Sequence, residues 1–172
     1  MIQTHMNDVK ERIIAILRAT GRPGIEAVIG YLENSSYFKR GCYGHHKEYG
    51  GLAKHSLEVY EHMLAHAGGL PADSIAIAGL FHDLGKTARR DGRGHGQRSV
   101  DILERLGFEL TADERTAIGR HHDKSLDFIT CPLRRALSLG DMSSTGAWKR
   151  AHPELCHHRR NHRKVSDHHD IK

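Results

Sequence analysis

The sequence predicts an all-α fold, a compact helical bundle that forms one domain and ends in a tail. Apolar residues recur at the i, i+3 and i+4 spacing of amphipathic helices in most segments, and no convincing alternation typical of strands accompanies them. A length of 172 residues suits a single core. We expect this domain to cover residues 1–150. Residues 151–172 should form a basic, histidine-rich, flexible tail, because they contain too few apolar residues for a core.

The N-terminal third is predicted to contain two helices and a loop. One face of residues 7–20 is apolar and consists of Val9, Ile13, Ile16 and Leu17. Gly21 stops this helix, and Pro23 opens a second helix over residues 22–35. Residues 37–51 (YFKRGCYGHHKEYGG) are polar and interrupted by glycines, which predicts a loop.

The rest of the chain predicts helices joined by short polar segments. A helix is expected over residues 52–66. Pro71 opens another over residues 71–86 that is apolar nearly all round, as buried helices are. Thr111 and Glu114 have the spacing of a capping box at a helix start. Further helices are expected over residues 97–107, 111–123 and 132–144, with a loop over residues 87–96.

The composition excludes several classes of protein. Hydrophobic residues make up 38% and charged residues 27%, as in globular domains, but 16 histidines are a large excess. The cysteines Cys42, Cys131 and Cys156 form no CxxC pair, which argues against a thiolate zinc site and fits a reducing compartment. No apolar run of about 18 residues and no secretory leader are present, so we expect a cytoplasmic protein without membrane contact.

One segment of the chain concentrates positive charge. The net charge of +5 is spread too widely to indicate a nucleic-acid surface by itself. Five cations nevertheless fall within thirteen residues, namely Lys86, Arg89, Arg90, Arg93 and Arg98. This run predicts that an anionic ligand binds nearby.

The segment GLFHDLGK, residues 79–86, places His82 and Asp83 at the end of an apolar helix. A buried carboxylate costs several kcal/mol unless a positive partner or a metal ion compensates it. Neighbouring side chains on a helix point about 100° apart, so both can converge on one ion that lies between them. The structural alternative is a pair at a helix end that forms only local hydrogen bonds.

Other candidate metal ligands lie on separate predicted elements. They are His55, His121, His122 and Asp141 on helices, and His95 in a glycine-rich loop. In a helical bundle, side chains from facing helices can meet at one interior site. The alternatives are a helix-end cap or a surface charge for Asp141, and ordinary surface positions for His95, His121 and His122.

The ordered set His55, His82-Asp83 and Asp141 resembles the signature of the HD-domain metal-dependent phosphohydrolase superfamily, and FHDLGK is its most specific part. The resemblance covers residues 37–144. The segment HHKEYGGLAKH is also similar to a branch that includes YhaM-type 3′-to-5′ exoribonucleases. Those enzymes usually carry an additional nucleic-acid-binding OB domain, for which this sequence leaves no length. That departure argues against a long RNA substrate.

The resemblance implies an HD-domain-like bundle with a metal site in its core. It implies two divalent ions that share Asp83. The other ligands would be His55, His82 and Asp141 for the first ion, and His95, His121 and His122 for the second. Imidazole and carboxylate ligands without thiolate favour Mn²⁺, Fe²⁺, Ni²⁺, Co²⁺ or Mg²⁺ over structural zinc.

The expected activity is hydrolysis of a phosphate ester of a nucleotide or short oligonucleotide by metal-activated water. Coordination lowers the pKa of water from about 15.7 to roughly 7. We expect Asp83 and Lys86 to be catalytic. Lys86 and Arg98, with Arg89 or Arg90, should hold the substrate phosphate. His45 and His46 should line the mouth of the site, with an ordinary loop position as the alternative for both.

Two other functions stay open at this stage. The chain is alternatively a non-catalytic nucleotide-sensing or partner-binding module with a structural metal. A third possibility is an RNA-processing subunit in which the tail makes weak, salt-dependent RNA contacts. Neither the exact substrate nor the oligomeric state follows from the sequence.

Overall fold

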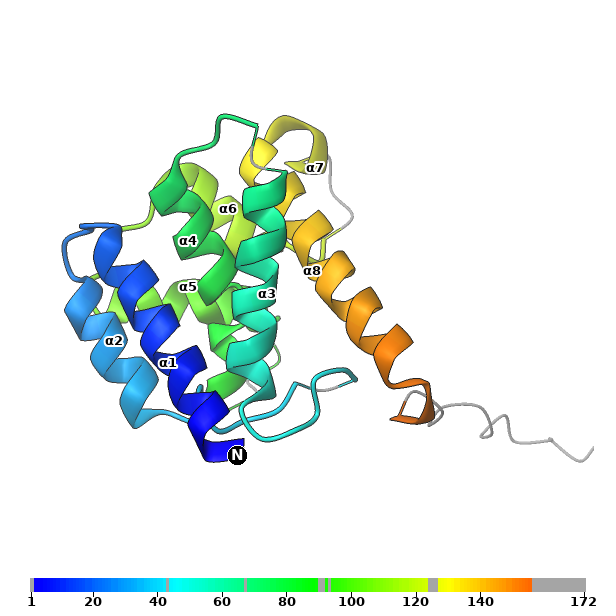
Figure 1. Ribbon diagram of the computed structural model, residues 1–172. Helices are drawn as coiled ribbons and strands as arrows, with labels where there is room; N and C mark the ends of the chain where they lie inside the picture. The colour runs from blue at the N-terminus through cyan, green and yellow to red at the C-terminus, as the bar shows by residue number, and fades with distance from the viewer. Residues whose placement is uncertain are drawn as a thin grey trace, which may run out of the picture.

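The computed structural model describes residues 2–42, 44–66, 68–89, 92, 94–123 and 127–155. Within these ranges all regular structure is helical, which confirms the predicted all-α class (Figure 1). The α-helices are α1 (Ile2–Ala19), α2 (Ile25–Asn34), α3 (Gly51–Ala65), α4 (Ala72–Phe81), α5 (His95–Arg105), α6 (Ala112–Arg120), α7 (Asp127–Thr130) and α8 (Pro132–Ala151). The 3-10 turns are η1 (Leu84–Thr87) and η2 (Pro153–Leu155). None of the described helices is both long enough and apolar enough to cross a membrane.

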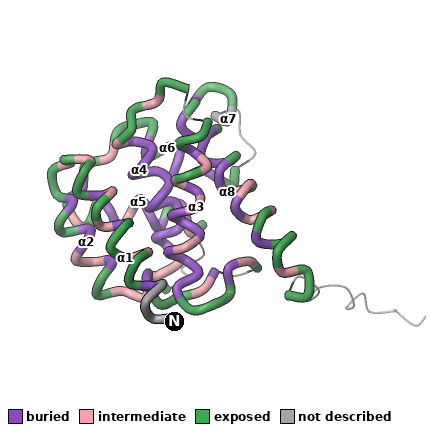
Figure 2. The backbone as a smooth tube through the Cα atoms, viewed as in Figure 1, coloured by how far each residue is buried: buried purple, intermediate pink, exposed green. Residues whose placement is uncertain are grey.

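Helix α4 lies at the centre of the bundle, as its apolar sequence predicts. All its residues from Ser74 to Phe81 are buried, and α3, α6 and α8 pack against it. Helices α1 and α2 lie on one side of α3 and α4, and α8 lies on the other (Figure 1). Figure 2 shows the buried residues concentrated along α3 and α4 in the interior.

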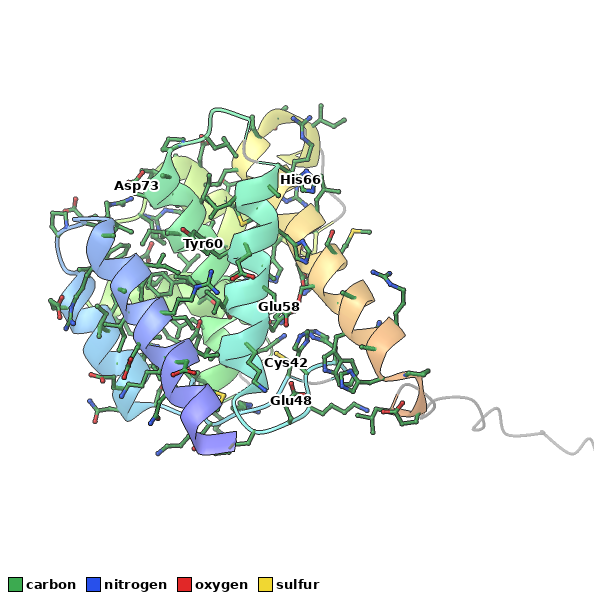
Figure 3. The ribbon with its side chains drawn as sticks, in the orientation of Figure 1. Cys42, Glu48, Glu58, Tyr60, His66 and Asp73 are labelled. Carbon is green, nitrogen blue, oxygen red and sulfur yellow. The ribbon has the colours of Figure 1, made fainter. Side chains whose placement is uncertain are left out.

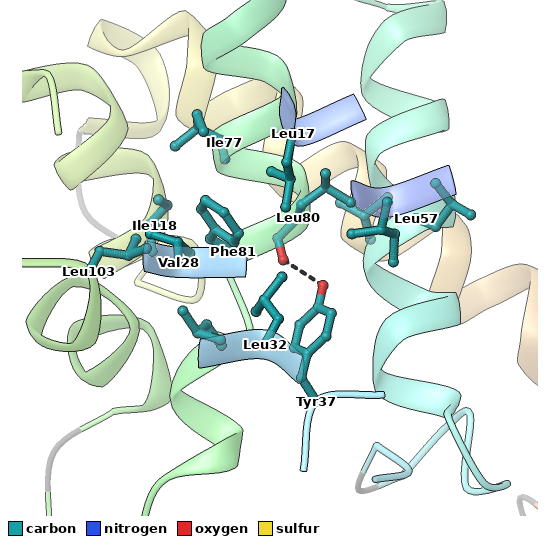
Figure 4. Close-up of a cluster of buried hydrophobic side chains, with 14 of the residues drawn as sticks. Leu17, Val28, Leu32, Tyr37, Leu57, Ile77, Leu80, Phe81, Leu103 and Ile118 are labelled. Atoms are coloured by element: carbon teal, nitrogen blue, oxygen red, sulfur yellow. Dashed lines mark hydrogen bonds between the residues drawn. The ribbon is translucent and has the colours of Figure 1, made fainter. Parts of the chain in front are cut away.

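The apolar core closes around the end of α4 (Figure 4). Leu17 of α1, Leu32 of α2 and Phe81 of α4 are fully buried, and a side chain of this size contributes about 1.5–3 kcal/mol on burial. Tyr37 donates a hydrogen bond from its hydroxyl to the carbonyl oxygen of Leu80 at 2.8 Å. This bond satisfies a carbonyl that has no helical partner in the last turn of α4.

A buried ion pair joins the α1–α2 turn to α6. The Arg22 guanidinium contacts both carboxylate oxygens of Glu114, at 2.7 and 3.1 Å. Ser74 of α4 donates to the same carboxylate at 2.7 Å. Glu114 and Thr111 also form the capping box predicted from the sequence. One carboxylate therefore fixes the relative positions of three segments.

Helix boundaries differ from the prediction where they affect the site. Helix α4 ends at Phe81 instead of continuing to residue 86, because the chain tightens there into η1. Helix α8 continues to Ala151, beyond the predicted end at residue 144. Its extension is stabilised by Trp148, which is buried with its ring 5.6 Å from that of His46, measured between centroids.

The predicted tail overlaps the end of the described chain. Lys47 donates a hydrogen bond from Nζ to the carbonyl oxygen of Leu155 at 2.7 Å, so η2 packs on the loop before α3. Residues 156–172 lie outside the described residues, and their flexibility stays a prediction.

Candidate metal centre

The His82-Asp83 pair occupies the point where α4 stops being an α-helix. The amide of His82 still donates to the carbonyl of Ala78 at 3.1 Å, as in an α-helix. Asp83 leaves helical geometry with φ −102° and ψ 5°, and η1 follows it. The break directs the Asp83 carboxylate into the space between α3, α5 and α8.

Helix α5 holds this turn in place. Ser99 accepts a hydrogen bond from the amide of Gly85 at 2.7 Å, and its hydroxyl lies 2.9 Å from the carbonyl oxygen of His82. Gly85 is required for this close packing, because a Cβ at residue 85 would overlap the carbonyl oxygen of His95. The glycine in FHDLGK therefore permits the first turn of α5 to approach the turn that carries His82 and Asp83.

The first cluster lies between α3, the end of α4 and α8. The Nε2 atoms of His55 and His82 are 3.3 Å apart, and both rings are buried. Oδ2 of Asp83 lies 3.6 Å from the first of these nitrogens and 3.5 Å from the second. Oδ1 of Asp141 lies 3.1 Å from His55 Nε2. The four residues predicted to bind the first ion are therefore brought together in the interior.

The second cluster uses the other oxygen of Asp83. Oδ1 lies 3.1 Å from His95 Nε2 and 3.9 Å from His121 Nε2, and the two nitrogens are 3.2 Å apart. His122 is more peripheral, with 59% of its side chain exposed and its Nε2 4.0 Å from Asp141 Oδ2. The ligand atoms of His95, His121 and His122 nevertheless lie within 4.8 Å of one another. His95 is the first residue of α5, not a loop residue as predicted.

Hydrogen bonds to backbone carbonyls fix the ring nitrogens that face the site. His82 donates from Nδ1 to the carbonyl of Gly79 at 2.9 Å, and His121 donates from Nδ1 to that of Ile118 at 2.8 Å. When a neutral imidazole carries its proton on Nδ1, the lone pair is on Nε2. The Nε2 atoms that meet around Asp83 are therefore the ones able to bind a cation.

Charge states in the site agree with a metal-ligand set. Burial lowers the pKa of His121 to about 3 and also lowers the pKa of His82, so both rings are neutral. Burial alone would raise the pKa of Asp83, but its neighbour His82 and the ammonium charge of Lys86 outweigh burial and hold that pKa well below its usual range. Neutral imidazoles with ionised carboxylates are donors that divalent ions of the first transition row bind.

One oxygen of Asp83 requires a further partner. Oδ1 is buried and has no hydrogen bond of acceptable geometry among the described residues, although His95 Nε2 lies nearby. A buried carboxylate oxygen in this state is costly unless a cation binds it. The residues present therefore fit a divalent ion on each side of Asp83.

A cleft of about 1090 Å³ opens directly onto the two clusters. Asp141, His95, His121 and His122 form part of its wall. Cationic side chains also line it, namely Arg40, Lys47, Lys86 and Arg98. The cleft therefore presents positive charge beside the candidate metal ligands.

Lys86 and Arg98 occupy different parts of this cleft wall. Lys86 follows Asp83 by one turn of the 3-10 helix, where residues i and i+3 eclipse, and its Nζ lies 2.5 Å from Asp83 Oδ2. Arg98 is buried, and its Nε donates to the carbonyl of Gly85 at 3.2 Å. Arg89 is exposed and does not line the cleft, and Arg90 and Arg93 lie outside the described residues.

The prediction that His46 lines the mouth of the site disagrees with its position. Only 1% of His46 is exposed, because its ring packs between those of His55 and Trp148. Its Nε2 lies 3.0 Å from Oε2 of Glu58. The adjacent His45 does line the cleft, as predicted for both histidines. His45 and His46 are identical residues in a polar loop, so the sequence alone does not show which of the two rings points inward.

Sequence reasoning missed several polar residues behind the candidate ligands. Glu58 lies on the side of α3 that faces α8 (Figure 3), where it accepts a hydrogen bond from Ser144. Ser138 donates to the carbonyl of His121 at 3.1 Å, and Arg134 donates from Nε to that of Arg120 at 2.9 Å. For the residues of α8 the available signal was their spacing, since residues 134, 138, 141 and 144 recur at intervals of three or four and so share one face of that helix.

Comparison with known proteins agrees with this geometry. A family model described as HD domain matches residues 52–163, more than half of the chain, and this region contains both clusters. None of the curated proteins and none of the solved structures matches the chain. The similarity of HHKEYGGLAKH to the YhaM-type branch therefore stays a prediction.

Proposed function

Because the chain belongs to the HD-domain family, we propose that it is a metal-dependent phosphohydrolase or phosphodiesterase. The proposed substrate is a phosphate ester of a nucleotide or short oligonucleotide. The observation that carries this proposal is the position of Asp83. Its two oxygens face separate clusters of candidate ligands, so each oxygen could bind an ion of its own.

Each cluster supplies a ligand set of its own. His55, His82 and Asp141, with Asp83 Oδ2, would hold one divalent ion. His95, His121 and His122, with Asp83 Oδ1, would hold the other. Bound divalent ions supply Lewis acidity, which activates water near neutral pH and offsets the charge that develops on phosphoryl oxygens.

The cationic residues that line the cleft could bind a substrate that carries phosphate. Lys86 carries three donors and gives one to Asp83, so its ammonium can also bind a phosphate oxygen at the cleft surface. Arg40 and Lys47 add positive charge along the same wall. Ligand clefts commonly have volumes of about 300–1000 Å³, so this cleft accommodates a nucleotide or a short oligonucleotide end. The resemblance of HHKEYGGLAKH to exoribonuclease-like sequences, which stays a prediction, supports the oligonucleotide within this class.

The proposal is tested by elemental analysis of the purified protein, followed by hydrolysis assays with each metal found and with added Mn²⁺ and Ni²⁺. The assay panel contains bis(p-nitrophenyl) phosphate, mononucleotides and short oligonucleotides. We expect phosphate ester hydrolysis in the wild type, and its loss together with bound metal in Asp83→Asn. Arg89→Gln is the control, because Arg89 is exposed outside the cleft.

Equal hydrolysis by Asp83→Asn and the wild type would contradict the proposed site. Nucleotide-dependent thermal stabilisation without product, across all the metals, would instead favour the non-catalytic sensing module.

A further inference from the structure

Behind His55, away from the cleft, a hydrogen-bonded pair connects α3 with α8. Ser144 Oγ lies 2.9 Å from His55 Nδ1 and 2.7 Å from Glu58 Oε2. Ser144 and His55 are fully buried, whereas 42% of the Glu58 side chain is exposed. Nothing in the proposed function so far assigns a role to Ser144 or Glu58.

The direction of the proton in each bond follows from chemistry. A carboxylate only accepts hydrogen bonds, so the single hydroxyl proton of Ser144 is directed to Glu58. Burial opposes the charge on Glu58, but hydrogen bonds from His46 and Ser144 outweigh it and lower its pKa, so the group is ionised. Ser144 therefore has only lone pairs left for His55, and His55 must donate from Nδ1.

The consequence appears at the other nitrogen of the ring. With its proton on Nδ1, His55 presents a lone pair on Nε2 toward His82 and Asp141, 3.3 and 3.1 Å away. With the opposite tautomer, His55 would present a proton to the same position and could not bind a cation there. Backbone carbonyls fix the tautomers of His82 and His121. The tautomer of His55, the third buried histidine of these clusters, depends instead on a side chain.

We propose that Ser144 and Glu58 are positioning residues that fix the tautomer and ring orientation of His55 as a metal ligand. This inference rests on the metal site of the proposed function. Outer partners of ligating histidines commonly act in this way, and their removal costs about 10- to 100-fold in metal affinity. Here the partner is Ser144, which donates its only hydroxyl proton to Glu58, a residue on the same helix as His55.

The test compares variants that keep or remove each hydrogen-bonding atom. Ser144→Ala removes the acceptor for His55, whereas Ser144→Thr keeps a hydroxyl. Glu58→Met removes the acceptor for Ser144, whereas Glu58→Gln keeps a carbonyl oxygen. The matched control is Ser143→Ala, the same substitution at the preceding, partly exposed position of α8. Since Glu58 is partly exposed, its variants should fold even if Ser144→Ala does not.

Two measurements follow for each variant. Nitrogen-15 NMR of the metal-free protein reports which nitrogen of His55 is protonated, with the signal assigned by its loss in His55→Gln. Calorimetric titration with Mn²⁺ reports the affinity of each binding step. We expect the Nδ1-protonated form in the wild type, Ser144→Thr, Glu58→Gln and Ser143→Ala. In Ser144→Ala and Glu58→Met we expect mixed tautomers and about 10- to 100-fold weaker binding in one step.

The possible failures are distinguishable. If the wild type binds Mn²⁺ and both Ser144→Ala and Glu58→Met bind it equally well with unchanged tautomer, this inference is wrong and the proposed function stands. If the wild type carries its His55 proton on Nε2, the inference is likewise wrong. If the wild type binds no divalent ion under any condition, the inference and the proposed function are both overturned.

Discussion

At the scale of single residues, the site depends on which atom of each side chain faces its neighbours. The two oxygens of Asp83 face opposite clusters, and the histidines around them turn Nε2 inward because Nδ1 donates elsewhere. Lys86 is the cation closest to this carboxylate and also reaches the cleft. A single substitution can therefore separate substrate binding from metal binding.

Replacing Lys86 with methionine removes the ammonium while keeping an unbranched apolar side chain. A hydrogen bond to a charged group contributes about 1.5–3 kcal/mol, so kcat/KM for a phosphate ester should fall about 10- to 100-fold. The loss should appear mainly in KM, because the ammonium holds substrate phosphate. Steady-state kinetics at saturating metal measure this effect, with Arg89→Gln as the control. An unchanged kcat/KM would remove Lys86 from the substrate site.

At the scale of elements, two junctions determine the geometry of the site. Gly85 allows η1 to pack under the first turn of α5, which carries His95. Glu114 joins the α1–α2 turn, α4 and α6, and the end of α6 carries His121 and His122. Contacts outside the cleft therefore fix the relative positions of the candidate ligands.

Gly85→Ala should destabilise the protein and weaken one of the two metal-binding steps. The added Cβ would overlap the carbonyl of His95 and approach the amide of Ser99, and overpacking of this kind costs about 1–3 kcal/mol. Chemical denaturation and Mn²⁺ titration measure the two effects. Gly30→Ala in α2 is the matched control, since nothing lies within 4 Å of its added Cβ. There the exchange should be neutral or stabilising, by about 0.5–1 kcal/mol. Equal stability of both variants would contradict the packing argument.

Glu114→Ala should lower the free energy of unfolding by about 3 kcal/mol at pH 7, because it removes the buried carboxylate partner of Arg22 and leaves only the more exposed Asp73, 3.2 Å away. Burial opposes ionisation of Glu114, but Arg22, Thr111 and Ser74 outweigh it and lower its pKa in the folded protein. A lowered carboxyl pKa stabilises the fold above the unfolded value of about 4.3 and loses that contribution as pH falls through the folded value.

The difference between the wild type and Glu114→Ala should therefore shrink as the pH is lowered below about 4. Urea denaturation at pH 7 and at successively lower pH measures it. A difference that stays constant would show that the ion pair is not the source of the stability.

At the scale of the whole molecule, the two clusters join helices that are distant in the chain. Their residues come from α3, the end of α4, α5, the end of α6 and α8. Because unfolding separates these segments, an ion bound to the clusters should stabilise the entire bundle and not one helix alone.

Addition of Mn²⁺ at about 100 times its Kd should raise the free energy of unfolding by about 2.7 kcal/mol. For a chain of this size that corresponds to a rise in Tm of roughly 5–10 °C. Thermal denaturation with and without Mn²⁺, and after EDTA treatment, measures the shift. Asp83→Asn is the control, since it keeps every histidine of the tail and should show little shift. The same shift in both proteins would place the stabilising ion elsewhere.

Much of this molecule could be predicted from the sequence because its signals are local. Apolar residues at helical spacing determined the all-α class and the buried character of α4, and the spacing of Thr111 and Glu114 determined the capping box. The residues of both clusters could also be named from the sequence as candidate ligands, and their binding of metal stays a prediction. Each is an imidazole or carboxylate beside a helix end or an apolar face, where burial without a partner is costly.

Only the tertiary structure decided how these residues meet. The end of α4 at Phe81, the inward position of His46 and the hydrogen bonds of Ser144 depend on segments that are far away in the sequence. Local spacing determines which face of a helix a side chain occupies. Packing between helices determines which atom of that side chain points at a neighbour, because proton positions and close backbone contacts are set only when the helices come together.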